Sequence, residues 1–375
     1  MADRRINLLI VASSLWIGGA ESVIRHLALS LDRRRFNVLV GYLKDLGHVG
    51  EELVREGAEV VPINEPVRPG AKPKVDYLTF VNLRRLVRAR HIDLVHTHTI
   101  HGIVDAAACK LVMPRLKTLH TFHFGNYPHL APRDLWMEFL SCRIATRLVA
   151  VGHGQKRQLM AAHHLSDDDL SVVYNGVQLP SGTGDPGFRA SIGAEGTLLI
   201  GTICTLIEQK GVPDLLEVAR RVVDAGHDVR FVIVGEGRLR PMIEARRREL
   251  GLDGHVVLTG WLTDAAVRAL PTFDIFFQPS LWEAMSMVTL EAMAVGRPIV
   301  ATRVGEAPAI LEDGRDGFLV EPRDVDGMTA ALLRLITEPG LRERVGEAAR
   351  RKVEGRFTVQ DMTQAYEAIY EEMCR

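Results

Sequence analysis

Two glutamates, Glu283 and Glu291, are separated by seven residues within the segment Pro279–Gly305. An apolar strand is predicted to end at Gln278, and a helix to begin near Met287. Backbone N–H groups at the start of a helix bind anions such as phosphate without needing a particular side chain. One carboxylate before that helix and another inside it would accept hydrogen bonds from the hydroxyls of a sugar or ribose. The same spacing also suits two solvated surface glutamates, so it does not decide the function alone.

Histidines form a second group of reactive side chains. A His-x-His sequence at a strand end occurs in metal-dependent hydrolases, but no acidic ligand here has a helpful spacing. In the predicted strand, Asp93 lies on the face opposite to His96 and His98. We therefore expect no metal ion. The group comprises His96, His98, His101, His120, His123 and His129.

Short runs rich in β-branched residues alternate with longer amphipathic segments along the chain. This alternation is typical of parallel sheets covered by helices. In the first half, strands are predicted at Ile6–Ala12, Asn37–Tyr42, Glu59–Ile63, Asp93–His96, Lys117–Thr121, Arg147–Val151 and Ser171–Tyr174. In the second half they are predicted at Leu198–Ile203, Arg230–Val234, His255–Thr259, Asp274–Gln278 and Pro298–Ala301. The sequence thus predicts two doubly wound, Rossmann-like α/β domains.

The segment Leu179–Gly196 is rich in glycine and contains two prolines, a composition that favours a loop. We expect a first domain at residues 1–180, a linker at 181–196 and a second domain at 197–356. A final helix at 357–375 is expected to pack back on the first domain. Because ligands of doubly wound sheets bind beyond the carboxyl ends of the strands, the two domains are expected to face a central cleft.

The composition is that of an ordinary globular protein: 375 residues, of which 47% are hydrophobic and 25% charged. No stretch has the eighteen or so apolar residues that a membrane-spanning helix needs. The four cysteines show no paired spacing that would indicate a zinc site or a disulfide framework. We expect a reduced, cytoplasmic protein.

Basic residues are concentrated between Glu65 and Arg90. Such a run is compatible with a solvated helix face. It is equally compatible with peripheral contact, through Arg68–Arg90, with an anionic membrane surface such as the inner membrane face, or with an anionic acceptor. Few aromatic residues accompany the charges and no nucleic-acid motif is present, so no nucleic-acid partner is expected.

The segment around Glu283 and Glu291 resembles the E-x7-E signature of family 4 glycosyltransferases, which are retaining enzymes of the GT-B fold. The resemblance keeps the family's order over almost the whole chain, and its motifs are specific in combination. The further matching segments are Gly18-Gly19-Ala20-Glu21, Asn175-Gly176-Val177, Lys210-Gly211-Val212, Gly235-Glu236-Gly237, Gly260-Trp261, the run from Glu291 to Thr302, Asp316-Gly-Phe-Leu-Val and Asp324.

The resemblance implies a role for each matching residue. Glu283 would hold hydroxyls of the donor sugar, and Glu291 the donor ribose. Lys210 would neutralise the departing diphosphate as a point charge. Gly18 and Gly19 would let the first loop approach the phosphates closely. Backbone amides of three further residues would approach the distal phosphate and the sugar: Ser286, Met287 and Val288.

The segment Thr118–Phe124 resembles the family's strand-end histidine segment. His120 then falls where a histidine lies near the transferred sugar, and it is favoured over His123 and His98. A neutral imidazole there would hydrogen-bond a sugar hydroxyl or the acceptor. A histidine that is merely packed at a strand end would have the same sequence.

The chain departs from the family pattern at Thr205, where an arginine commonly partners the lysine on the diphosphate. A threonine donates a hydrogen bond but carries no charge, and charge-assisted hydrogen bonds are about twice as strong as neutral ones. The residues Ala-Met-Ser after Glu283 also replace the usual Gly-Phe-Gly, and Ala309 replaces a usual glutamate. These departures place the donor's identity and the full activity in question.

The resemblance implies a retaining, metal-independent hexosyl- or N-acetylhexosaminyl-type transferase without a cofactor. Its partners would be a nucleotide-sugar donor, with UDP favoured over GDP, and an envelope-glycan, lipid-linked or small-molecule acceptor. Two alternatives remain. One is a sugar-nucleotide epimerase of related fold, although no acid/base pair is evident in the first domain. The other is a donor-binding scaffold without transfer activity, for which Thr205 is the support.

Overall fold

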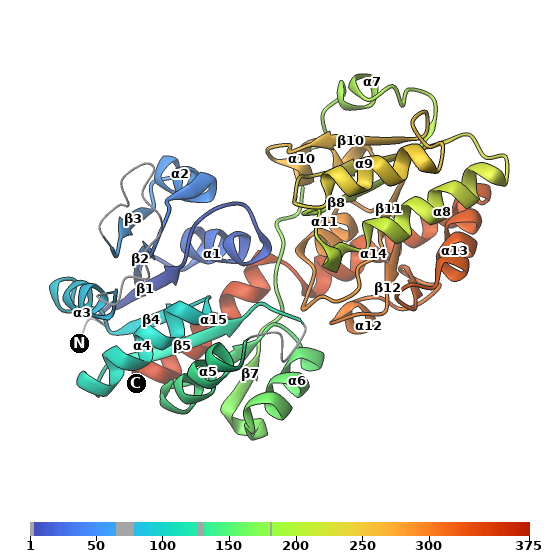
Figure 1. Ribbon diagram of the computed structural model, residues 1–375. Helices are drawn as coiled ribbons and strands as arrows, with labels where there is room; N and C mark the ends of the chain where they lie inside the picture. The colour runs from blue at the N-terminus through green and yellow to red at the C-terminus, as the bar shows by residue number, and fades with distance from the viewer. Residues whose placement is uncertain (1–3, 65–78, 126–130, 181) are drawn as a thin grey trace. The chain divides into compact units, whose positions relative to one another are not determined.

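The computed structural model of the chain describes residues 4–64, 79–125, 131–180 and 182–375. The chain divides into two compact units. Unit 1 consists of Met1–Gly176 and Val359–Arg375, and unit 2 of Val177–Thr358 (Figure 1). The division therefore lies at Gly176–Val177, ahead of the segment 181–196 in which we expected a linker.

Unit 1 is built on a parallel sheet whose strand order, within the described residues, is β3-β2-β1-β4-β5-β6-β7. The central strand β1 (Ile6–Ala12) is buried along most of its length, because both faces of the sheet are covered. The other strands are β2 (Phe36–Tyr42), β3 (Glu59–Pro62), β4 (Leu94–Thr97), β5 (Lys117–Phe122), β6 (Arg147–Ala150) and β7 (Leu170–Val172). The helices are α1 (Gly19–Ser30), α2 (Gly47–Arg55), α3 (Thr79–Ala89), α4 (Ile100–Val112), α5 (Pro132–Ile144), α6 (His153–His163) and α15 (Val359–Cys374).

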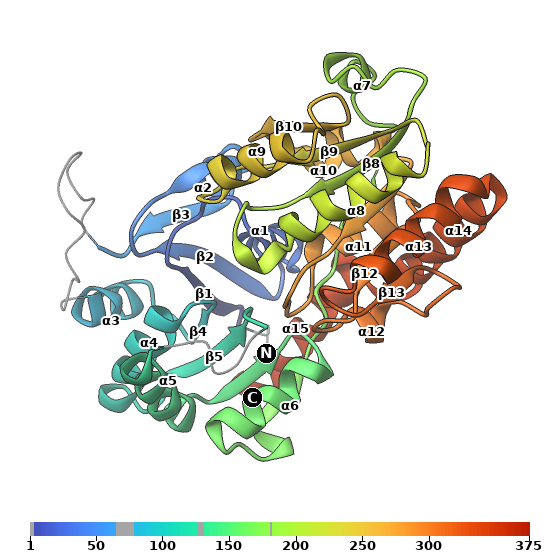
Figure 2. The same ribbon diagram turned by 45° about the vertical axis from the view of Figure 1, so that its right-hand side comes forward.

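Helix α15 returns to unit 1 after the chain has completed unit 2. It packs against α1 and lies beside the strands of unit 1, as both views show (Figures 1 and 2). The buried side chains of Tyr366 and Tyr370 attach it to the sheet. Tyr370 Oη lies 2.7 Å from His96 Nδ1, and Tyr366 Oη lies 2.9 Å from Thr121 Oγ1. The first unit is thus completed by the last helix.

Unit 2 is built on a second parallel sheet, and the order of its described strands is β10-β9-β8-β11-β12-β13. The strands are β8 (Leu198–Ile203), β9 (Val229–Val234), β10 (Val256–Gly260), β11 (Ile275–Gln278), β12 (Ile299–Thr302) and β13 (Phe318–Val320). The helices are α7 (Phe188–Ser191), α8 (Val212–Asp224), α9 (Arg240–Glu249), α10 (Ala265–Arg268), α11 (Met287–Ala294), α12 (Ala307–Ile310), α13 (Val325–Thr337) and α14 (Pro339–Arg356). With two such sheets, the expected Rossmann-like fold class is confirmed.

The segment that we expected to be a linker packs onto unit 2 over most of its described length. Phe188 of α7 is buried and its ring lies 6.4 Å from that of Phe273. Arg189 donates to the carbonyl oxygens of Thr272 and Thr197 and to the carboxylate of Asp274. The many glycines of this segment predicted a loop. Phe188 and Arg189 nevertheless attach the segment to unit 2.

Candidate functional site

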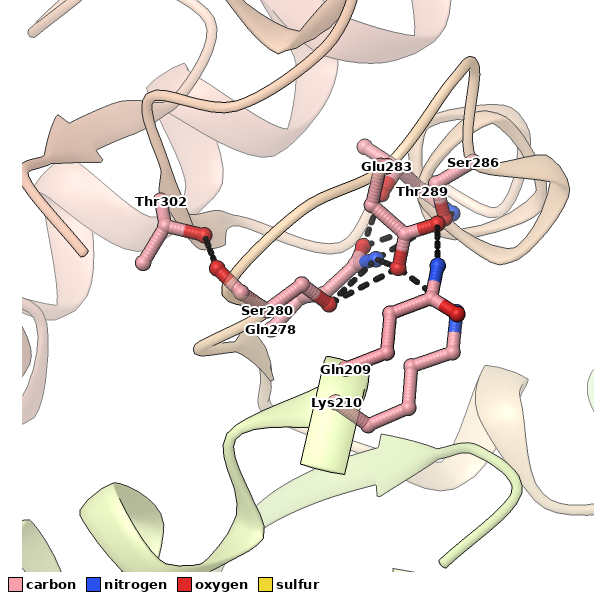
Figure 3. A network of polar contacts seen from close by, with 8 residues as sticks. All are labelled: Gln209, Lys210, Gln278, Ser280, Glu283, Ser286, Thr289 and Thr302. Carbon is pink, nitrogen blue, oxygen red and sulfur yellow. Dashed lines mark hydrogen bonds and ion pairs between the residues drawn. The ribbon is translucent and has the colours of Figure 1, made fainter. Parts of the chain in front are cut away.

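The site residues of unit 2 converge at the carboxyl ends of three neighbouring strands, β8, β11 and β12. Glu283 is in the loop after β11 and is 8% exposed. Its Oε1 accepts hydrogen bonds from Ser280 Oγ at 2.8 Å and Gln278 Nε2 at 3.2 Å, and its Oε2 from Gln209 Nε2 at 3.2 Å. Figure 3 shows the carboxylate at the centre of this network. The arrangement fixes a single orientation of the Glu283 side chain.

Lys210 reaches the same carboxylate from the loop after β8. Its Nζ lies 2.6 Å from Glu283 Oε1, and its side chain is 22% exposed. The structure therefore brings together the two charged residues that the sequence placed 73 positions apart. Each is the counter-ion of the other, so a ligand that bound either side chain would have to compete with this ion pair.

Two glycines allow the loops to approach so closely. Gly211 has a φ of +61°, and a Cβ atom there would lie 1.9 Å from the carbonyl oxygen of Pro279. The adjacent Leu281 N–H donates to the carbonyl oxygen of Gln209 at 2.7 Å, which ties the two loops together. Gly305, with a φ of +55°, would place a Cβ atom 2.4 Å from the carbonyl oxygen of Glu283. Only glycine fits either position, because both the conformation and the space exclude a side chain.

Helix α11 begins directly beside this network. Ser286 is its N-cap and accepts a hydrogen bond from the N–H of Thr289 at 3.3 Å. Gln278 joins the cap to the network, since its Nε2 donates to Ser286 Oγ at 3.0 Å. The first N–H groups of a helix have no acceptor inside the helix, and here they belong to Met287 and Val288. Such groups attract anions, and the hydrogen-bond network connects them to Glu283, the partner of Lys210.

Glu291 lies one turn inside α11 and is half-buried. Burial raises the pKa of its carboxyl group to about 7. Within the described residues no side chain forms a hydrogen bond or ion pair with this carboxylate. A carboxylate that loses water without gaining a partner is poised to accept hydrogen bonds from a ligand.

Thr205 is exposed in the loop after β8, five residues before Lys210. Nearby in the chain, Glu208 pairs with Arg238 from the loop after β9, and both side chains are largely exposed. Lys210 is therefore the basic residue of this loop that contacts the network. The charge that we expected to be missing at Thr205 is not supplied by another residue of the same loop.

In unit 1, the residues expected to contact substrate also lie at the carboxyl edge of the sheet. Gly18 is the N-cap of α1, which begins at Gly19. A Cβ atom on Gly18 would lie 2.3 Å from Oε2 of Glu21, whose pKa is raised by burial. The absence of a side chain at Gly18 therefore makes room for the Glu21 carboxylate at the start of α1.

The three histidines considered for contact with the substrate, His98, His120 and His123, differ in exposure and in hydrogen bonding. His120 is inside β5, is 2% exposed and shares a 2.8 Å hydrogen bond with Thr97 Oγ1. His123 follows β5 and is more exposed. Its Nε2 shares a 2.8 Å hydrogen bond with Nδ1 of His98, which follows β4. His123 is thus the more exposed of the two rings, and the assignment of His120 to the substrate stays a prediction. Strand β5 ends at Phe122, one residue later than predicted, and His123 is the first residue beyond it.

No group of three His, Cys, Asp or Glu side chains among the described residues is arranged to hold a metal ion. The histidine pKa values are lowered by burial, to about 3 for His120 and about 4 for His123. These rings are therefore neutral at physiological pH.

The basic stretch Arg68–Arg90 is described only in part, because residues 65–78 lie outside the described ranges. In the rest, Arg85, Arg88 and Arg90 are exposed on and after α3, and Arg90 pairs with Glu59 at 2.7 Å. In the part of the chain that the structure describes, no helix is both long and apolar enough to cross a bilayer.

Two Rossmann-like units, each with a parallel sheet covered by helices, define a protein of the GT-B fold. Two solved structures share the fold over the whole chain. HepE from Anabaena in complex with UDP-glucose has a TM-score of 0.86 at 20% identity and covers 98% of this chain and 100% of its own. Sucrose-phosphate synthase from Thermosynechococcus elongatus has a TM-score of 0.81 at 16% identity, covering 98% and 99%. The expected fold is confirmed.

Sequence comparisons give the family. The family described as "Glycosyltransferase Family 4" matches residues 17–179, and the one described as "Glycosyl transferases group 1" matches residues 197–338. The MMP alpha-(1->4)-mannosyltransferase of Mycolicibacterium hassiacum is 32% identical over 307 residues, which are 76% of this chain and 71% of the relative. The UDP-Gal:alpha-D-GlcNAc-diphosphoundecaprenol alpha-1,3-galactosyltransferase of Escherichia coli is 25% identical over 80% of each chain. The chain belongs to glycosyltransferase family 4, as its motifs indicated, and is a glycosyltransferase.

Proposed function

We propose that the enzyme transfers a hexose or N-acetylhexosamine from a UDP-sugar, held by unit 2, to a glycan, lipid-linked or small-molecule acceptor. The observation that carries the proposal is the Lys210–Glu283 pair at the start of α11. It supplies one cation, free helix N–H groups and an oriented carboxylate within one loop cluster. A diphosphate linked to a sugar has the matching chemistry, with anionic oxygens beside hydroxyl groups.

Glu291 completes the donor site in this proposal. Its carboxylate has no partner in the described part of the chain, and the vicinal hydroxyls of a ribose would supply two donors. The comparisons favour uridine as the base, since HepE was solved with UDP-glucose and the Escherichia coli relative is named for UDP-Gal. Burial of the network residues favours a fixed sugar orientation and therefore selectivity among hexoses.

We propose that transfer retains the anomeric configuration and needs no metal. The bond between the anomeric carbon and the diphosphate oxygen breaks, and the diphosphate leaves with the electron pair. The acceptor hydroxyl forms its bond on the same face, and its proton passes to the departing phosphate oxygen. Lys210 and the N–H groups of Met287 and Val288 stabilise the developing negative charge, the task that metal ions perform elsewhere.

Unit 1 is proposed to receive the acceptor. Gly18 and Gly19 lie at the start of α1, and His123 presents a neutral ring at the same edge of the sheet. In place of His120, which is enclosed between strands, we assign His123 to hydrogen-bond the acceptor or a hydroxyl of the transferred sugar. The neutral ring can donate or accept a hydrogen bond but does not bind an anion by charge.

We further propose that the exposed arginines of α3 contact an anionic membrane surface that carries the acceptor. Arg85 and Arg88 are exposed, and within the described residues neither forms an ion pair like that of Arg90 with Glu59. Sedimentation with vesicles of phosphatidylglycerol and with vesicles of neutral lipid tests this contact. Binding to the anionic vesicles that disappears in the Arg85→Gln/Arg88→Gln variant supports it, and equal binding of the variant rejects it.

The proposed function is tested by incubating the protein with a panel of UDP- and GDP-sugars. Thermal stabilisation identifies the donor, because a bound ligand raises the melting temperature by mass action. Release of UDP in the presence of acceptors, with and without EDTA, measures turnover and its dependence on metal. NMR of the new anomeric proton gives the stereochemistry. Donor binding without transfer or hydrolysis would favour the scaffold, and formation of an altered nucleotide sugar would favour the epimerase.

A further inference from the structure

The ends of β4 and β5 carry a pair of histidines whose rings are bonded to each other. His98 Nδ1 and His123 Nε2 are 2.8 Å apart, and the rings are stacked with centroids 5.1 Å apart. Their backbones are fixed by the sheet, since the His98 N–H donates to the carbonyl oxygen of Val11 at 3.2 Å. One nitrogen of each ring is therefore committed to this bond.

The remaining nitrogens of the two rings differ in their surroundings. His98 is 2% exposed, and its Nε2 is buried without a hydrogen-bond partner in the described structure. His123 is less buried, and no hydrogen bond of its Nδ1 is found within the described residues, so this nitrogen is the one that can bind a ligand. The ring of His96 supports His98 from behind, with centroids 4.0 Å apart. His96 itself uses both nitrogens, on Tyr370 and on Thr121.

The bond between two neutral imidazoles has two forms, because either ring can donate. If His123 donated, the proton of His98 would have to sit on the buried, unpartnered Nε2. If His98 donates from Nδ1, its Nε2 keeps only a lone pair. Buried N–H groups without an acceptor are rarer in proteins than acceptors without a donor. Burial lowers the pKa values of both rings, and neighbouring histidines lower that of His98 further, which keeps both rings neutral.

We propose that His98 is a positioning residue that sets the tautomer of His123. His98 donates from Nδ1 to His123 Nε2, and His123 consequently carries its proton on Nδ1 and offers an N–H donor at the carboxyl edge of unit 1. The partner of that donor is an oxygen of the sugar or of the acceptor. This last step rests on the proposed function, whereas the assignment of the protons does not.

NMR of the full-length protein with 15N-labelled histidine tests the assignment, since the two tautomers have distinct ring-nitrogen shifts. In the wild type we expect a protonated Nδ1 and a bare Nε2 on His123. The His98→Leu variant removes the donor and is expected to give a mixture of tautomers. The His98→Asn variant offers an amide N–H at the same place and is expected to restore the wild-type spectrum. Thr97→Val, which removes the partner of His120, serves as a control that should leave His123 unchanged.

Kinetics provide the second readout. His98→Leu is expected to lower kcat about tenfold with little change in the KM of the donor, because a misoriented group loses transition-state contacts. His98→Asn should recover most of the loss. A proton on His123 Nε2 in the wild type, or an unchanged tautomer in His98→Leu, overturns the inference. Absence of turnover by the wild type with every donor would instead count against the proposed function, and the NMR result would still decide the tautomer.

Discussion

Lys210 Nζ and Glu283 Oε1 lie 2.6 Å apart, so the cation and the carboxylate of the candidate donor site neutralise each other. The pair is fixed by Ser280 and Gln278 on one side and by the contact of Gly211 with Pro279 on the other. A nucleotide sugar would exchange this one ion pair for two contacts, phosphate with the lysine and hydroxyls with the glutamate. The first predictions follow from this exchange.

Replacing Lys210 by alanine is expected to lower kcat/KM by about 100-fold, as found when one group that stabilises a developing negative charge is removed. The measurement is UDP release under initial-rate conditions. Lys352→Ala is a matched control. Lys352 also forms an ion pair, at 2.8 Å with buried Asp316, but neither residue bonds to Glu283 or to the side chains around it. Equal losses in the two variants would show that a general effect on stability is being measured.

The Glu283→Gln substitution is expected to separate binding from turnover. The amide keeps the size of the side chain but releases Lys210 from its counter-ion, so affinity for UDP should rise about threefold, within the range of a partly exposed ion pair. Turnover should fall, because the carboxylate no longer accepts strong hydrogen bonds from the sugar. Calorimetry with UDP and a rate assay provide both numbers. Weaker UDP binding by this variant would contradict the idea that the diphosphate competes with Glu283 for Lys210.

Glu291 predicts a pH dependence of donor binding. Because burial raises its pKa to about 7, the carboxylate is mostly protonated at pH 6 and mostly ionised at pH 8. Ribose hydroxyls bind the ionised form more strongly, so affinity for an intact UDP-sugar should rise about five- to tenfold over this interval. Glu291→Gln should bind weakly and show a flat profile. A wild-type profile that falls with pH would reject the assigned contact.

Gly211 predicts a large effect on stability. In Gly211→Ala the new methyl group would meet the carbonyl oxygen of Pro279 as well as an unfavourable backbone conformation, and we expect a loss above about 3 kcal/mol. Gly226→Ala is the control, since its φ is +83° but a Cβ atom there has no neighbour within 4 Å. That variant should lose only about 1 kcal/mol. Urea unfolding compares the two, and similar losses would show that the contact with Pro279 is unimportant.

Tyr370 predicts how firmly α15 is attached to unit 1. Tyr370→Phe leaves Nδ1 of buried His96 without its partner and should cost about 1–3 kcal/mol of unfolding free energy. Glu372→Gln on the same helix disturbs only an exposed ion pair with Arg147 and should cost less than about 0.5 kcal/mol. Thermal unfolding provides the comparison. If the two variants had the same stability, the hydroxyl bond would contribute nothing measurable.

The sequence predicted secondary structure best where a segment's residue pattern fits only one kind of element. Strand runs such as Leu198–Ile203 were predicted to the residue, because β-branched segments between helices have few other interpretations. Strand β13 (Phe318–Val320) was not predicted, since three residues carry too little pattern. The segment around α7 was read as a linker because glycines dominate it, whereas its attachment depends on long-range bonds of Arg189.

The site shows the same division. Glu283, Lys210 and Glu291 could be selected from spacing and family resemblance, and two of them are now seen in direct contact. Their pairing could not be predicted, because it arises from parallel strands β8 and β11, which lie side by side although far apart in sequence. The choice of His120 over His123 came from the family resemblance, which does not show that His120 is enclosed within β5 whereas His123 follows the end of that strand.

The return of α15 to unit 1 has a consequence for synthesis on the ribosome. Tyr366 and Tyr370, which fill the interior of unit 1, are translated after every residue of unit 2. Domains of most proteins fold in the order in which they emerge. In this chain, unit 1 lacks α15, which covers part of its interior, until the whole of unit 2 has been translated. Nascent chains stalled before residue 359 should therefore expose that surface to chaperones and proteases.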